Sequence, residues 1–399
     1  LGQTGNSASG ASLYLGSYAS GNNYMDMSAI TPSSMQLNKL KWETTTEYNT
    51  GLDATFLKGK LRFTVDVYQK YVKDLLQPKV KMPTTIGYGN GYQISYMNSG
   101  KMTNKGWEFR VDAVPFQNKD WRVGVYFNIA HNENKITEMP DNYIEENYTF
   151  GNGNYAYRRE EGRPMGSFYG YRYKGVYQNK DATYARDIEG NVMKDISGNA
   201  IVMRNGSYTV APGDAIYEDV NHDGVINQYD IVYLGNSNPR LTGGAGLNVS
   251  YKQFKLSAIF YGRYGQDVVN ATRLNNESMR GIDNQSTAVL RRWRNEGDQT
   301  DIPRALYGEG YNTLGSDRFV EDASYLRLKS LSFTYRLPKK AIQRWGFNNI
   351  DVYVTGYNLF TWTNYTGQDP EVKTENTYAK DTATTPASIQ LVAGFNLSF

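Results

Sequence analysis

The sequence predicts an all-β fold and, within that class, a transmembrane antiparallel β-barrel. Long stretches alternate strictly between apolar and polar residues, and the connections between them are short and long in turn. The composition agrees, because the 399 residues include 34 Tyr and 39 Gly but only 12 Pro. This balance favours strands and turns over helices.

The alternation is clearest over residues 40–56. Even positions run from Leu40 to Phe56 through Leu, Trp, Thr, Tyr and Ala, while no odd position is apolar. This two-faced segment is much longer than the usual strand of about 5–6 residues. In the next segment, Arg62 and Asp66 alternate with apolar residues in the same way.

About nine such strands are expected. They cover residues 40–56, 61–76, 105–115, 121–137, 243–252, 254–265, 324–337, 349–362 and 388–399. A few residues join the members of a pair, whereas long polar segments at 77–104, 138–242, 266–323 and 363–387 separate the pairs. Transmembrane barrels have short periplasmic turns and long outer loops, so this pattern favours a membrane barrel over a sandwich.

The order of the strands also predicts orientation. If the strand at 40–56 runs toward the periplasm, so does the one at 388–399, and the C-terminus is periplasmic. Residues 138–242 then form one large extracellular loop. The last strand is apolar at every second residue from Ile389 to Phe399. Such an exposed apolar edge would promote aggregation in a soluble protein.

The bulk properties exclude several classes. The net charge of +3 gives no global indication of a nucleic-acid partner, and the absence of Cys excludes disulfides and zinc–thiolate sites. The sequence contains no run of about 18 apolar residues, which is the length that would predict a transmembrane helix. Only two His, His131 and His222, are available, and no carboxylate pair stands out for acid–base chemistry, so we predict that the chain is not an enzyme. The start at Leu1 lacks a signal peptide, so residues upstream are expected.

One segment resembles a calcium-binding loop. Residues 219–230 (DVNHDGVINQYD) place oxygen ligands at positions 1, 3 and 5, Gly at 6, a backbone carbonyl at 7 and a carboxylate at 12. The predicted ligands are Asp219, Asn221, Asp223, Val225 and Asp230. The expected role is structural, with Ile226 turned inward; the alternative is a polar turn without metal.

Other features have two interpretations. Tyr residues of the large loop could stack on sugars or could pack the loop against itself; they are Tyr155, Tyr157, Tyr169, Tyr171, Tyr173 and Tyr177. Short helices are expected at 286–296 and 339–345. The polar faces of the strands are expected to line the barrel interior with Lys41, Glu43, Arg62, Asp66, Glu108 and Arg110.

Several phrases resemble the C-terminal barrel portion of SusC/RagA-type TonB-dependent transporters. They include GQTGN at 2–6, LKWE at 40–43, NKGWE at 104–108, EGRP at 161–164 with GSFYG at 166–170, PGD at 212–214, LGNSNP at 234–239, RW at 292–293 with EGD at 296–298, SYLRL at 324–328, YNLFTWTNY at 357–365 and DPEV at 369–372. Together they span nearly the whole chain in the family's order.

The resemblance implies that residues 1–399 are the C-terminal portion of a plugged barrel of about 22 strands in the outer membrane. It implies an N-terminal plug and a TonB-contacting segment that this sequence lacks, and a SusD-like surface lipoprotein as lid. The implied function is TonB-dependent import of an oligosaccharide or peptide.

Two alternatives remain open from the sequence. One is a secreted, calcium-braced β-protein that binds or cleaves glycans, whose apolar faces would meet in a core. The other is a passive porin or adhesion barrel in the same membrane, without a plug or a lipoprotein partner.

Overall fold

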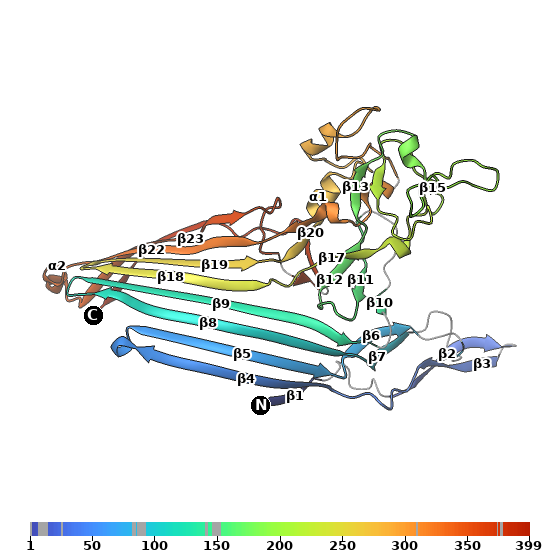
Figure 1. Cartoon of the computed structure of the whole chain (residues 1–399). Coiled ribbons are helices and arrows are strands. Elements are labelled where there is room, and N and C mark those ends of the chain that lie inside the picture. Colours follow the sequence, from blue (N-terminus) through green and yellow to red (C-terminus); the bar gives the residue numbers. More distant parts are fainter. Residues whose placement is uncertain are drawn as a thin grey trace.

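One antiparallel sheet dominates the molecule (Figure 1). The computed structural model describes residues 2–6, 15–24, 27–81, 85, 93–139, 143–145, 153–308, 310–372, 374–375 and 378–399. Within them the sheet has ten strands, in the spatial order β1 (Gly2–Asn6), β4 (Glu43–Phe56), β5 (Leu61–Lys73), β8 (Lys101–Gln117), β9 (Trp121–Glu138), β18 (Leu241–Tyr251), β19 (Phe254–Tyr264), β22 (Tyr325–Arg336), β23 (Asn349–Thr363) and β26 (Gln390–Ser398).

The nine predicted strands are confirmed, and β1 is an additional one. All neighbouring strands in the sheet are antiparallel. The boundaries differ by a few residues: β4 begins at Glu43 rather than at residue 40, and β8 begins four residues earlier than predicted, at Lys101. Strand β9 pairs directly with β18, and no described strand between them joins this sheet.

The register aligns the apolar residues of successive strands into rows on one face. Leu52 lies opposite Val65, Val65 opposite Phe109, and Phe109 opposite Ile129. Large side chains on this face remain exposed, for example Leu52 at 60%. Their exposure shows that no described element covers the face, as expected for a surface in contact with lipid.

The β22 strand contains a bulge that a strict alternation misses. Against β19, Phe260 pairs with Leu328 and Ile259 pairs with Ser330, which leaves Lys329 as an extra residue. A bulge of this kind exchanges the two faces of a strand. As a result, Leu328 and Leu331 share the apolar face although their numbers differ by three.

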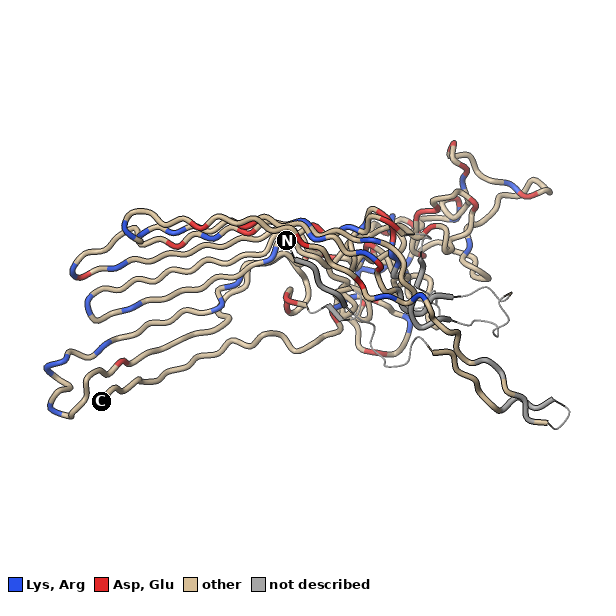
Figure 2. The backbone as a smooth tube through the Cα atoms, turned by 90° about the horizontal axis from the view of Figure 1, so that it is seen from below, with Lys and Arg blue, Asp and Glu red and all other residues tan. Residues whose placement is uncertain are grey.

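The two ends of the sheet differ. Short turns and helix α2 (Lys339–Ile342) lie at one end, and all the long connections lie at the other (Figure 1). Lys and Arg mark the short turns, whereas both charge signs occur in the long connections (Figure 2).

The long connections contain small elements of their own. These are β2 (Ser17–Tyr24), β3 (Met27–Ser34), β6 (Leu76–Lys81), β7 (Gln93–Asn98), β10 (Tyr143–Glu145), β11 (Tyr157–Arg159), β12 (Ser167–Gly170), β13 (Tyr173–Val176), β14 (Arg204–Asn205), β15 (Tyr208–Thr209), β16 (Ala215–Tyr217), β17 (Val232–Asn236), β20 (Asp267–Asn270), α1 (Ala271–Asn276), β21 (Val320–Asp322), β24 (Thr374–Glu375) and β25 (Tyr378–Asp381).

Helical structure is scarce. The expected helix at 339–345 is confirmed as α2 followed by a 3-10 turn at Gln343–Trp345. The helix expected at 286–296 is wrong, because only a 3-10 helix at Thr287–Arg291 forms there, capped by Ser286. No helix among the described residues is long and apolar enough to cross a membrane.

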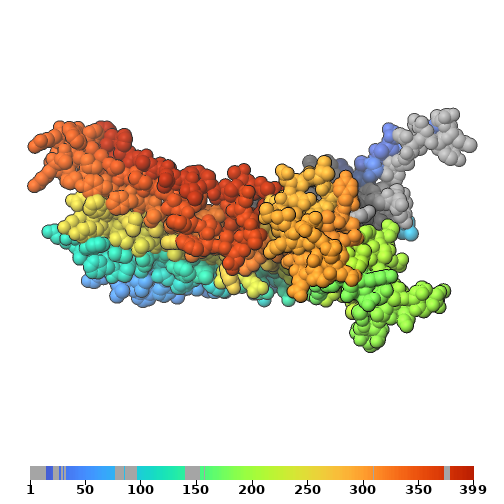
Figure 3. Space-filling model, turned by 90° about the horizontal axis from the view of Figure 1, so that it is seen from above, coloured from blue at the N-terminus to red at the C-terminus, as the bar shows by residue number. Residues whose placement is uncertain are grey.

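Segments 153–236 and 265–324 pack together into one body, called here the loop assembly (green and orange in Figure 3). Its main core contains Tyr171, Tyr217, Ile226 and Tyr311, all nearly inaccessible to solvent. This core brings together residues that are more than 130 positions apart in the sequence.

Gly315 fixes the closest approach between the two segments. Its carbonyl accepts a hydrogen bond of 2.9 Å from the N–H of Tyr171. A Cβ at this position would lie 2.2 Å from the carbonyl oxygen of Asn154, which is backbone and cannot swing aside. Gly is therefore required for the two segments to pack.

We expect Gly315→Ala to destabilise the loop assembly by about 1–3 kcal/mol, as overpacking does in cores. Gly281→Ala is a matched control in the same connection, because its nearest neighbour would be the Asp283 carboxylate at 3.7 Å. Hydrogen–deuterium exchange over 153–236 is the measurement. Equal protection in both variants would contradict the assigned packing.

Candidate functional site

The polar face of the sheet carries the side chains predicted to line the interior. Glu43, Arg62, Asp66, Glu108 and Arg110 all belong to strands and lie opposite the apolar rows. Lys41 lies just before β4, where its backbone N–H donates to Asn98 Oδ1 at 2.6 Å. The predicted wall residues thus come from β4, β5 and β8 and from the segment just before β4.

Charges of both signs alternate along this wall. Arg110 makes two hydrogen bonds to Asp112, at 2.7 and 2.8 Å, and its guanidinium lies 5.6 Å from the ring centroid of Tyr126. Asp66 lies directly opposite Glu108, which leaves two carboxylates adjacent. A hollow of about 570 Å³ opens here; its lining includes Lys60, Arg62, Thr64, Arg110, Asp112, Tyr126 and Asn248.

A second polar cluster ties the last long connection to the sheet. Arg327 of β22 is 2% exposed and contacts Asp369 at 2.5 Å and Glu371 at 2.8 Å. Lys329 also reaches Glu371, at 2.8 Å. The sequence offered SYLRL and DPEV only as separate phrases; the structure brings them together as a partly buried ion-pair network.

Asp214 forms the polar centre of the loop assembly. It is fully buried and accepts hydrogen bonds from Arg304 at 2.7 Å, from the Tyr208 hydroxyl at 2.7 Å and from Asn312 at 3.2 Å. The bond to Asp214 raises the pKa of Arg304 further. Sequence reasoning missed this network, since Arg304 lies 90 residues from Asp214 and no spacing rule connects them.

The loop tyrosines mainly pack the loop against itself. Tyr155, Tyr169, Tyr171 and Tyr177 are each at most 4% exposed, and Tyr173 is partly buried. The side chain of Tyr157 lies outside the described part of the chain. Four of the six rings are therefore closed to a sugar in this conformation.

The calcium-type loop folds as a sharp turn held by its own side chains. Asp219 accepts from the backbone N–H groups of Asp223 and Gly224, at 3.2 and 2.8 Å. Gly224 adopts φ = +79°, which its place at position 6 requires. Ile226 is fully buried, as predicted from its position.

The donor set fits calcium in part. The oxygens of Asp219, Asn221 and Asp223 follow the calcium-loop order. Asp230, however, is fully buried and uses both carboxylate oxygens to accept from the N–H groups of Val220 and Asn227, each at 2.8 Å. Among the described residues no group of three Asp, Glu, His or Cys is close enough to hold a metal.

Within this loop the pKa of Asp230 is raised from its ordinary value. Burial raises its pKa, and the nearby charges of Asp219 and Asp223 add to this effect, whereas the two backbone bonds oppose it. Concentrated negative charge of this kind is what a divalent cation would neutralise.

Comparison with known proteins identifies the family to which this sheet belongs. A family model described as "TonB dependent receptor-like, beta-barrel" matches residues 2–359. This chain belongs to the TonB-dependent receptor β-barrel family. The predicted resemblance to SusC/RagA-type barrels is confirmed.

Individual relatives agree. The chain is 32% identical over 346 residues to TonB-dependent receptor P3 of Formosa agariphila, which covers 85% of this chain and 32% of the relative. It is 29% identical to TonB-dependent receptor SusC of Bacteroides thetaiotaomicron, covering 90% of this chain and 32% of SusC. The structure of the RagAB peptide transporter matches the whole chain with a TM-score of 0.74 and 26% identity, over 40% of that transporter chain.

These matches show that the chain spans about a third of the length of the curated relatives. Barrels of this family are outer-membrane receptors and transporters. The exposed apolar rows of the TonB-dependent barrel are accordingly its membrane face.

We expect Asp214→Ala to destabilise the loop assembly by about 2 kcal/mol or more, because the charge of Arg304 loses its buried partner. This loss of stability lies below the usual range for breaking a buried ion pair, because the Arg304 side chain is 33% exposed. Glu218→Ala is the control: it removes an equally charged residue whose two partners, Arg172 and Lys174, are each about half exposed, and should cost less than about 1 kcal/mol. Thermal unfolding of the two variants, followed by proteolysis of the loop assembly, is the measurement. Equal losses of stability in Asp214→Ala and Glu218→Ala would contradict a central role for Asp214.

Proposed function

We propose that this chain is part of a TonB-dependent importer that moves an oligosaccharide or peptide across the outer membrane. In this proposal the chain is not catalytic, the long connections lie outside the cell and the C-terminus is periplasmic. A SusD-like lipoprotein covers the barrel, and a plug and a TonB-contacting segment belong to the rest of the protein. The whole barrel has about 22 strands.

The family match is the observation that carries the proposal. It is supported by a wall that presents both charge signs to the interior, as a peptide or a polar glycan in water would require. The name of RagAB gives a peptide as its cargo, and the polar wall would suit a glycan as well, so both cargo classes stay in the proposal.

The position of the loop assembly also supports a lid partner. The segments 153–236 and 265–324 form a packed body at the end of the sheet that carries all long connections (Figure 3). A packed body offers a rigid surface on which a lipoprotein can rest, whereas separate flexible loops would have to be ordered first at an entropic cost.

The alternative of a secreted glycan-binding protein is disfavoured by the exposed apolar rows. That alternative needs two apolar faces to meet in a core, but Leu52, Phe127 and Phe333 are each more than 40% exposed. The passive porin shares the sheet and differs only in gating and partners.

Mass spectrometry of the complex purified in detergent from native outer membranes tests the proposal. We expect a longer polypeptide that contains this chain, together with a surface lipoprotein in equal amount. Conductance in a planar bilayer is the matched measurement: a plugged importer should be closed. Recovery without a lipoprotein, combined with an open pore, would favour the porin instead.

We propose further that the 219–230 loop binds calcium through Asp219, Asn221, Asp223, the carbonyl of Val225 and Asp230, and thereby braces the large loop at 138–242. The calcium would supply positive charge to a cluster of carboxylates. The backbone bonds that Asp230 already accepts are compatible with this role, because each carboxylate oxygen has two lone pairs.

Millimolar calcium should stabilise the loop by about 1 kcal/mol, the value expected for a weak extracellular-type site. Asp223→Asn should abolish this gain, although Asn can still accept the 2.8 Å bond from Val225 N–H. Asp195→Asn is the control, in a neighbouring turn of similar design. Hydrogen exchange with calcium and with a chelator is the measurement; the same calcium response in both variants would rule out the site.

A further inference from the structure

Four lysines stand on the membrane face of the sheet at the end that carries the long connections. They are Lys73, Lys101, Lys105 and Lys135, and all four are exposed. Lys73 of β5 lies directly opposite Lys101 of β8, and Lys105 lies two residues from Trp107 on the same face. Lys135 of β9 lies opposite Thr103. Three adjacent strands thus gather four cations on one outward surface, called here the lysine patch.

The lysine patch is only partly neutralised. Lys101 forms an ion pair with Glu138. Glu133 lies opposite Lys105 in the register, but in the described part of the chain no ion pair involves Lys73, Lys105 or Lys135. Four cations against two carboxylates leave an excess of two positive charges on the surface.

A hollow of about 430 Å³ lies beside the lysine patch. Its lining is Tyr48, Thr50, Val67, Tyr68, Gln69, Lys105, Gly106, Trp107, His131 and Glu133. Aromatic contacts shape it: Tyr48 meets Tyr71 edge-on at 6.2 Å, and Trp107 lies 6.0 Å from His131. The hollow is therefore lined by aromatic rings together with one cation, Lys105, and one anion, Glu133.

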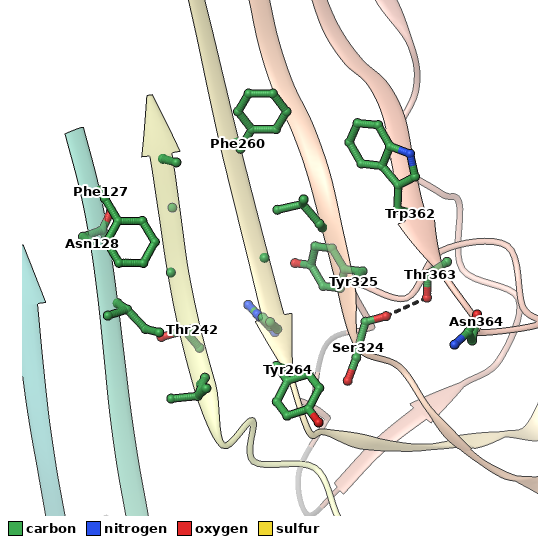
Figure 4. A pocket seen from close by; sticks show the side chains of 18 residues that line it. Phe127, Asn128, Thr242, Phe260, Tyr264, Ser324, Tyr325, Trp362, Thr363 and Asn364 are labelled. Atoms are coloured by element: carbon green, nitrogen blue, oxygen red, sulfur yellow. Dashed lines mark hydrogen bonds between the residues drawn. The ribbon is translucent and has the colours of Figure 1, made fainter. Parts of the chain in front are cut away.

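An apolar groove of about 550 Å³ lies on the same face. Its lining residue Leu241 is the register neighbour of His131, which lines the hollow. Gly243 and Gly262, which face each other across β18 and β19, leave the floor of the groove without side chains. Phe127 and Trp362 stand on opposite sides of the groove (Figure 4).

The positive charge of the lysine patch is confined to β5, β8 and β9, whereas the apolar rows continue across the sheet. Beyond β9, the lining of the groove presents Tyr264, Ser324 and Asn364, which are polar but neutral, and one cation, Arg263, whose guanidinium lies over the ring of Tyr261. A general interfacial belt would distribute Lys along the whole rim. A cluster of Lys joined to an apolar channel instead matches a ligand with an anionic head and a hydrocarbon tail.

We infer that this surface binds a phosphorylated glycolipid of the outer leaflet, with its phosphate on the lysine patch and an acyl chain in the groove. The inference rests on the proposed orientation of the importer, since the long connections must lie at the outer leaflet. Ammonium–phosphate contacts at the edge of hydrocarbon are weakly screened, and each lysine adds to the attraction. Charge complementarity thus selects the phosphate, and the groove selects the acyl chain.

Native mass spectrometry of the full-length protein, purified in detergent and titrated with lipid A, tests the site. The variant Lys73→Gln/Lys101→Gln/Lys105→Gln/Lys135→Gln should bind about tenfold or more weakly. The same four positions changed to Arg should restore binding. The control Lys58→Gln/Lys119→Gln/Lys252→Gln/Lys340→Gln removes four exposed charges at the short turns and should bind like the parent.

Two lipid comparisons identify the ligand chemistry. Dephosphorylated lipid A should bind about tenfold more weakly to the parent, and phosphatidylethanolamine should compete poorly. Unchanged binding by the Gln variant, equal loss in the control, or equal affinity for the dephosphorylated lipid would each overturn the inference.

The orientation is tested separately, so that the two failures can be told apart. The sequence contains no Cys, so Ile196→Cys, at an exposed turn, places a single thiol in the loop assembly. An impermeant maleimide should label it in intact cells, whereas Lys119→Cys should react only after permeabilisation. The reverse pattern would overturn the proposed orientation and the glycolipid with it; correct labelling with unchanged lipid binding would overturn the lipid site alone.

Discussion

The structure depends on one constraint, the antiparallel ladder of backbone hydrogen bonds that joins neighbouring strands from β1 to β26. Within hydrocarbon no water can satisfy an N–H or C=O group, so a spanning strand must pair its backbone with neighbouring strands. Once the ladder exists, successive side chains point to opposite faces. The division between the membrane face, with Leu52 and Phe127, and the wall with Arg62 and Arg110 follows from the same ladder.

The ladder contains local irregularities that keep apolar and polar side chains on separate faces of the sheet. The bulge at Lys329 restores Leu328 and Leu331 to one face, and Lys329 itself turns its charge to Glu371. At Gly243 and Gly262 the sheet omits side chains instead; a Cβ on Gly243 would lie 2.5 Å from the Asn128 carbonyl oxygen. The absence of side chains at these two glycines allows the strands to lie close together, and it also opens a groove toward the membrane.

Outside the sheet, specific polar contacts replace the ladder as the organising force. Asp214 draws Tyr208, Arg304 and Asn312 together around one buried carboxylate, and Arg327 fastens the last long connection to β22. The network around Asp214 combines residues from two long connections, which gives the loop assembly a single packed form. A rigid body of this kind suits the importer proposed above, in which a lid would meet a defined surface.

The sequence by itself determined the membrane-type sheet, nine of its strands and the two faces, because a period of two is local and can be read along the chain. It also determined the inward position of Ile226, whereas the calcium ligands at 219–230 stay a prediction. Tertiary structure alone decided the bulge at Lys329, the burial of the loop tyrosines, the network around Asp214 and the groove at Gly243 and Gly262. These features join residues through register or across 90 or more positions, and no local periodicity encodes such distances.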